Sequence, residues 1–195
     1  MTDAADRRTG GAAVAAGLLM FVSVAAELRR PVQDADGTVT SVPGFVLYVA
    51  TWTLGAAALV VAVHGLGVGR STAGRIGRAA SLAGAGLLTA FGIVGLGTAL
   101  VAGSPAEWSF LLFAVGLLLL VVGAVPLALG LRPGVPRWWT AVLVAGAGAA
   151  VALLAEADPW HDLGLFVFFL AWALLGVAWT QRSRRSADRV AAPVG

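Results

Sequence analysis

The chain has 195 residues, of which 59% are hydrophobic and 12% are charged, and its mean hydropathy is +0.90. A soluble domain has about a quarter of its residues charged, so this composition excludes an ordinary soluble fold and favours transmembrane helices. The lack of cysteine excludes disulfides, thiolate metal sites and cysteine nucleophiles. All 13 basic residues are arginine, which is typical of a GC-rich bacterial genome.

Six apolar segments of about 17–24 residues follow one another, and each can cross a hydrocarbon core about 30 Å thick. Because lipid offers no hydrogen bonds, each span must be a helix that satisfies its own backbone. The sequence therefore predicts an all-α polytopic bundle with spans at 11–28, 45–68, 79–102, 110–131, 138–154 and 163–180. Residues 1–10 are expected to form a cytoplasmic N-terminal segment, 11–180 a six-helix transmembrane domain, and 181–195 a cytoplasmic tail rich in arginine.

The first span has a second interpretation. Arg7 and Arg8, the apolar run after them and the small residues at 23–25 also fit a signal peptide with its cleavage site. Cleavage would leave five spans and an outer N-terminus.

The distribution of arginine predicts the orientation. With the N-terminus inside, only Arg29 and Arg30 of the 13 basic residues fall in outer segments. Positive charge stays on the cytoplasmic side, so both termini are predicted to be cytoplasmic and the chain to lie in the cell membrane. Because the arginines flank apolar runs, anionic lipid at the inner face is an expected partner and nucleic acid is not.

A weak internal repeat relates the even-numbered spans. Pro43 to Arg70 and Pro105 to Arg132 bracket spans 2 and 4 at the same separation of 27 residues. This spacing favours three helical hairpins in parallel orientation, and the alternative is that membrane hairpins in general share such flanks.

Stripes of small residues are expected to hold the helices together, because they let backbones approach closely in lipid. The same stripes fit a homo-oligomer interface, and sequence alone does not separate the two. The stripes are Gly86 and Ala90 in span 3, Ala141, Ala145 and Ala149 in span 5, and Gly164, Ala171 and Ala178 in span 6.

No charged residue lies at mid-depth in any predicted span, which argues against an ion-coupled transporter. A permease for a neutral solute would need Thr51, Trp52, Thr89 and Trp172 to line a midplane cavity. Threonine hydroxyls can instead bond to the preceding helical turn. His64 is expected in the solvated inner interface.

Two outer helix starts carry capping residues. Asp158 precedes Pro159, and Asp162 falls in the first turn, where the helix dipole favours negative charge. Ser104 and Glu107 form the pattern of a capping box before span 4. Capping therefore accounts for these carboxylates without any chemistry.

A functional site at the outer face is the alternative, because histidine titrates near neutral pH and capping does not explain His161. No metal or other cofactor is predicted. The candidate residues of this outer-face site are Tyr48, Glu107, Trp108, Asp158, Trp160, His161 and Asp162.

Three classes of function remain. The chain is predicted to be a non-enzymatic accessory, assembly or lipid-interacting subunit, with a homo-oligomer or another membrane protein as its partner. The alternatives are a permease or channel for a neutral or lipophilic solute, and a membrane enzyme that uses His161 with Asp158 or Asp162 as an acid–base pair.

Overall fold

The computed structural model describes residues 3–29, 41–66, 71–102, 105–106, 108–131, 146–148 and 160–191. No β-strand occurs in these ranges, so the described part is all-helical, as the sequence predicts. The long helices are α1 (Asp3–Arg29), α2 (Val42–Gly65), α3 (Thr72–Ala102), α4 (Ser109–Leu129) and α6 (Trp160–Ala191).

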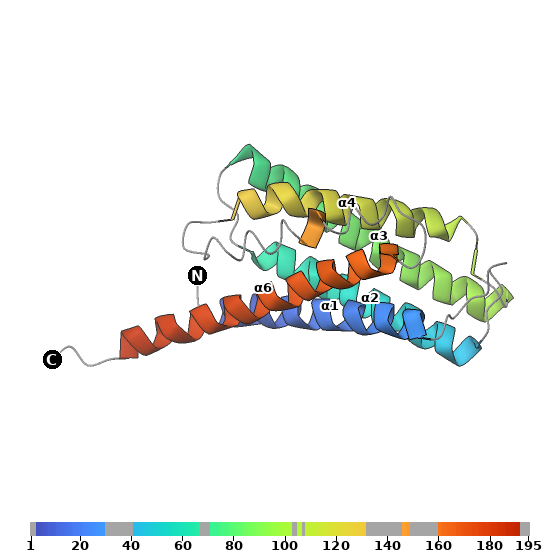
Figure 1. Cartoon of the computed structure of the whole chain (residues 1–195), viewed down its shortest axis with the longest axis horizontal. Helices are drawn as coiled ribbons and strands as arrows, with labels where there is room; N and C mark the ends of the chain where they lie inside the picture. The colour runs from blue at the N-terminus through green and yellow to red at the C-terminus, as the bar shows by residue number, and fades with distance from the viewer. Residues whose placement is uncertain are drawn as a thin grey trace.

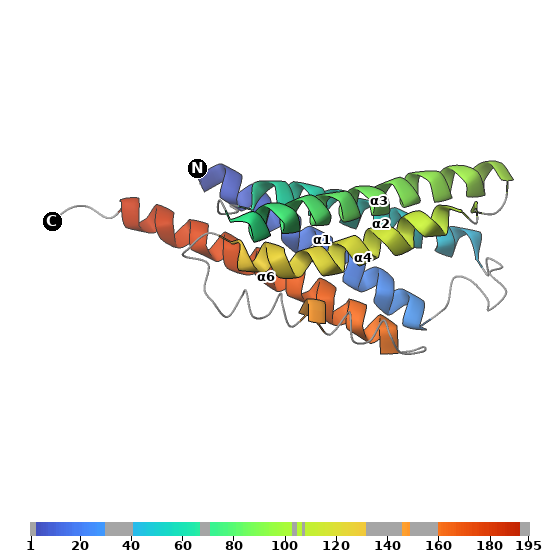
Figure 2. The same cartoon turned by 90° about the horizontal axis from the view of Figure 1, so that it is seen from above.

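The long helices lie side by side in an elongated bundle (Figure 1; Figure 2). Helix α1 packs against both α6 and α2, α2 packs against α3, and α3 packs against α4. Helices α1 and α3 begin at the same end of the bundle at which α2, α4 and α6 end (Figure 1). This arginine end carries the side chains of Arg7, Arg8, Arg75 and Arg78.

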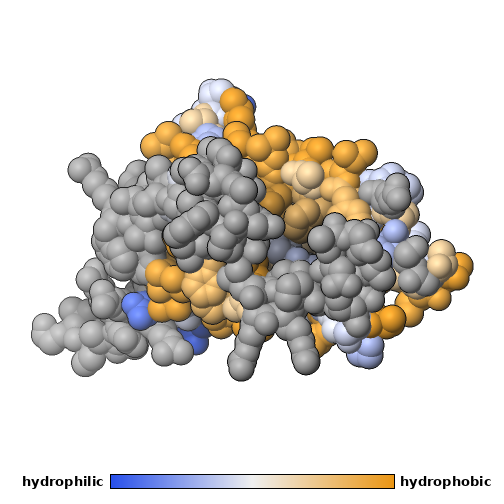
Figure 3. Space-filling view, turned by 45° about the vertical axis from the view of Figure 1, so that its right-hand side comes forward, coloured by the Kyte–Doolittle hydropathy of each residue, from blue (hydrophilic) through white to orange (hydrophobic). Residues whose placement is uncertain are grey.

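Five described helices are long and apolar enough to cross a membrane. Large aliphatic side chains point outward along them: Leu47, Leu54 and Val61 on α2 are 67%, 60% and 54% exposed. Apolar residues cover much of the coloured surface in Figure 3. Such a surface requires lipid around it, so the chain is a multi-pass membrane protein. The predicted fifth span at 138–154, and with it the third hairpin, lies outside the described residues except for a helical piece at 146–148.

Glycine lets α3 and α4 approach until their backbones touch. A Cβ atom placed on Gly84 would lie 2.6 Å from the carbonyl oxygen of Gly116 and 2.6 Å from the backbone nitrogen of Leu120. One on Gly123 would lie 2.9 Å from the backbone nitrogen of Ser81. Apolar side chains gain little by leaving lipid, so this close backbone packing stabilises the pair.

A second glycine contact joins α1 to α6, the first and last helices of the chain. A Cβ atom on Gly17 would lie 2.6 Å from the carbonyl oxygen of Phe169. One on Gly176 would lie 2.6 Å from the carbonyl oxygen of Gly10. The N-terminal helix is therefore locked against the C-terminal helix by backbone contact.

The small-residue stripe predicted for span 3, Gly86 and Ala90, is not the face that packs against α4. A Cβ atom on Gly86 would meet nothing within 4 Å, whereas Gly84 packs on α4. Residues two apart on a helix point roughly 200° from each other, so the two glycines face opposite directions. Ala171 of the span-6 stripe does make a close contact, since a Cβ atom on Gly146 would lie 2.9 Å from its Cβ. The stripe at 141–149 lies outside the described residues except for 146–148.

The helix ends differ from the predicted spans. The Ser41 hydroxyl caps α2 by accepting a hydrogen bond from Gly44 N at 3.3 Å, and Ser71 accepts one from Gly74 N at 3.1 Å at the start of α3. Helix α4 begins at Ser109 without a side-chain cap, so it does not start at the predicted capping box, whose Ser104 and Glu107 lie outside the described residues. At the termini, α1 and α6 extend through residues 3–10 and 181–191, because arginine is a good helix former outside the membrane as well.

Candidate functional site

The predicted outer-face site is only partly within the described residues. Helix α6 begins at Trp160, which puts His161 and Asp162 in its first turn as predicted, but nothing is described of these three side chains. Trp108 stands just before α4 and is 57% exposed. Tyr48 is half-buried on α2. Asp158 and Glu107 lie outside the described residues, so the outer-face site remains a prediction.

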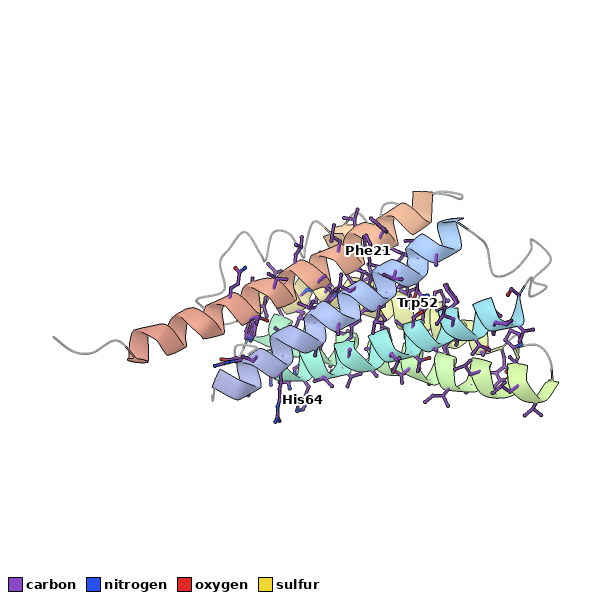
Figure 4. All side chains as sticks on the ribbon, turned by 90° about the horizontal axis from the view of Figure 1, so that it is seen from below. Phe21, Trp52 and His64 are labelled. Atoms are coloured by element: carbon purple, nitrogen blue, oxygen red, sulfur yellow. The ribbon has the colours of Figure 1, made fainter. Side chains whose placement is uncertain are left out.

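Aromatic rings from several helices pack together next to Tyr48. The Trp52 ring of α2 makes edge contacts with Phe113 of α4 and Phe169 of α6, at centroid distances of 5.2 and 5.3 Å. Phe113 continues the cluster to Phe91 of α3 at 5.2 Å. We call these rings, with Tyr48, the aromatic core. Trp52, which is 1% exposed, therefore joins α2 to α4 and α6, and Phe113 extends the cluster to α3 (Figure 4).

The threonines singled out as cavity-lining candidates bond to their own helices. The Thr89 hydroxyl donates to the carbonyl oxygen of Ala85 at 2.8 Å, and that of Thr51 donates to the carbonyl oxygen of Tyr48 at 2.8 Å. The Thr51 hydroxyl also lies 2.5 Å from the hydroxyl of Ser23, which links α2 to α1. These hydroxyls therefore have partners without any solute.

The buried tryptophans Trp52 and Trp172, unlike the threonines, have no hydrogen-bond partner in the described structure. Trp52 and Trp172 are 1% and 0% exposed, and the described structure gives neither indole nitrogen an acceptor. An unpaired buried donor costs about 1–3 kcal/mol. Indole donors are thus held in an apolar interior at a real energetic cost.

A pocket of about 440 Å³ lies at the arginine end, between the start of α1 and the end of α2. We call it the arginine-end pocket. Its polar wall contains Arg8 and His64, both exposed, and its apolar wall contains Val60 and Val61. Figure 4 shows His64 projecting away from the bundle at this end. The complete lining is Ala5, Arg8, Thr9, Val60, Val61, His64 and Gly65.

A third helix supports the pocket. Arg78 of α3 donates to the carbonyl oxygen of His64 at 2.8 Å, and its guanidinium nitrogen lies 3.4 Å from His64 Nδ1. This contact satisfies a carbonyl at the end of α2 and places positive charge at the negative end of the helix dipole. It also fixes the α2 terminus that carries His64.

Sequence reasoning placed His64 correctly in an exposed position but did not join it to Arg8. The spacing of the lining residues could have predicted each wall of the pocket, because residues 5, 8 and 9 share one helical face, as do 60, 61, 64 and 65. What the sequence lacked was the register in which α1 and α2 pack.

No known protein family, curated protein or solved structure matches this chain in sequence or fold.

Proposed function

We propose that this chain is a non-enzymatic accessory, assembly or lipid-interacting subunit of the cell membrane, with its arginine end and both termini in the cytoplasm. The observation that carries the proposal is the packing around Trp52. Rings from α2, α3, α4 and α6 occupy the middle of the bundle, where a solute path would have to run.

The glycine contacts add to this argument. Backbones in contact at Gly84 and Gly17 leave little room for two helices to slide or part, as alternating access would require. A bundle held in this way suits a stiff scaffold that acts through its surfaces. The arginine balance supports the orientation, with positive charge on the cytoplasmic side.

A permease for a neutral or lipophilic solute is the second candidate. The unpaired indole nitrogens of Trp52 and Trp172 favour it, because each could donate a hydrogen bond to a carbonyl or hydroxyl of a passing solute. That role requires the aromatic core to open.

The absence of natural cysteine allows a direct test of this choice. Two single-cysteine variants would be made, Ala56→Cys, one helical turn from Trp52 on the same face of α2, and Thr89→Cys. They would be treated, in membranes made permeable so that both sides are accessible, with a charged, water-soluble thiol reagent. Thr72→Cys, exposed at the start of α3, is the reactive control. The scaffold predicts labelling of the control alone, and labelling of Ala56→Cys or Thr89→Cys would favour the permease.

The subunit role has its own test. Extraction in mild detergent from the cells that produce the protein should give a native complex larger than the 19.7 kDa chain, with a second membrane protein or further copies in fixed stoichiometry. A monomer under several mild detergents would contradict an assembly role.

A further inference from the structure

We propose that the arginine-end pocket binds the phosphate head group of an anionic phospholipid from the cytoplasmic leaflet. This inference rests on the orientation given under the proposed function. It adds a specific lipid site between α1 and α2, made of residues that belong neither to the predicted outer-face site nor to the arginine-rich tail.

The pocket has the two-sided chemistry of a lipid. Arg8 and His64 can donate hydrogen bonds to phosphate oxygens, while Val60 and Val61 offer an apolar wall on the same side of α2. Basic pockets between transmembrane helices on the cytoplasmic side suit anionic head groups for this reason. A volume of about 440 Å³ accommodates a glycerophosphate group.

The charge around the pocket is predominantly positive. The positive charges are Arg8 of α1 and Arg78 of α3, and His64 of α2 adds a ring N–H that can donate to phosphate, so three helices contribute to one site. Asp6 of α1 is acidic and lies close to Arg8 in sequence, and it does not line the pocket. Arg78 already donates to the backbone of α2, so its part is to position His64 and to add charge.

Lipid is favoured over a soluble phosphate by the surface next to the pocket. Val61 is 54% exposed, and it continues the row of Leu54 and Leu47 along the side of α2 that points away from the bundle. Residues seven apart lie on one helical face, so this row offers an apolar track from the pocket toward the membrane interior. Acyl chains can follow the track while the phosphate stays beside Arg8.

The back of the pocket is already packed. The Thr9 hydroxyl donates to the carbonyl oxygen of Ala5 at 2.9 Å, and the Thr9 side chain fills the space beside Gly65. Thr9 is therefore expected to shape the pocket, and the basic side chains to hold the ligand.

The test measures lipid binding by the purified full chain. Phosphatidylglycerol or phosphatidylcholine is added, and the bound lipid is detected by native mass spectrometry. Phosphatidylglycerol should bind more tightly, and Arg8→Gln should weaken it about fivefold, the effect of one basic residue near an anionic surface. Arg75→Gln removes the same charge from an exposed position outside the pocket and should change little. Equal binding of the two lipids, or equal losses in the two variants, would overturn the proposal.

A second pair of variants tests shape rather than charge. Val61→Trp should fill the pocket and lower phosphatidylglycerol binding severalfold, while Val22→Trp, at a similarly exposed position of α1, should not. Inorganic phosphate should not displace the lipid, and displacement would overturn the lipid assignment. If the lipid does not bind while Ala56→Cys stays unlabelled, the lipid site is wrong and the proposed function stands. If Ala56→Cys is labelled, the proposed function is contradicted instead.

Discussion

Replacing Gly84 with alanine is expected to destabilise the bundle by about 1–3 kcal/mol, the usual effect of overpacking. The added Cβ atom would lie 2.6 Å from two backbone atoms of α4, whereas ordinary contacts begin at 3.4 Å. Neither partner is a flexible side chain, so α3 and α4 would have to separate by about 0.8 Å along their contact. Movement on that scale also disturbs the neighbouring contact between Gly123 and Ser81.

Gly86→Ala is the matched control, because it adds the same methyl group to the same helix where nothing lies within 4 Å. Alanine is a better helix former than glycine by up to about 1 kcal/mol, so this variant should be neutral or slightly stabilised. The assay is thermal unfolding of the purified proteins in mild detergent. In a chain of this length, each kcal/mol shifts the melting temperature by roughly 2–4 °C.

Equal melting temperatures for Gly84→Ala and Gly86→Ala would mean that the two faces of α3 are equally open. The packing of α3 on α4 described above would then be wrong.

Three further predictions concern single positions. Ser41→Ala should lower stability by about 1 kcal/mol through loss of the α2 cap, measured by the same melting assay, and no loss would remove the capping role. Trp52→Ala should cost about 3–5 kcal/mol because its buried ring packs against rings of α4 and α6. Trp52→Phe should cost much less because it keeps a ring and removes an unpaired donor, and equal losses would contradict the packing. His161→Ala should abolish function with little change in melting temperature if the outer face holds a site, and an unchanged growth or activity phenotype would reduce this stretch to a helix start.

Long apolar runs made the helical class predictable. The runs at 45–68 and 110–131 correspond to α2 and α4 within a few residues, because a membrane leaves a chain no other way to satisfy its backbone. Helix ends were harder to predict. A helix does not have to end where the membrane ends, so α6 continues eleven residues beyond its predicted span through an arginine-rich tail.

Helix faces could not be predicted from one helix at a time. Both Gly84 and Gly86 belong to glycine–alanine repeats, and only the position of Gly116 on α4 decides which of them is buried. The arginine-end pocket has the same origin. Arg8 and His64 are ordinary interfacial residues until the packing of α1 on α2 brings them to one wall.

The most direct test of the account labels the two ends of α3. This helix has 31 residues, roughly 46 Å, which is enough to cross the hydrocarbon core and emerge on both sides. Cysteine would replace Thr72 at the arginine end or Val101, 90% exposed, at the other end, and intact cells would be treated with a membrane-impermeant maleimide. The account predicts that Val101→Cys is labelled at once and Thr72→Cys only after the membrane is permeabilised. Labelling of both in intact cells, or of Thr72→Cys alone, would contradict a transmembrane bundle with its arginine end in the cytoplasm.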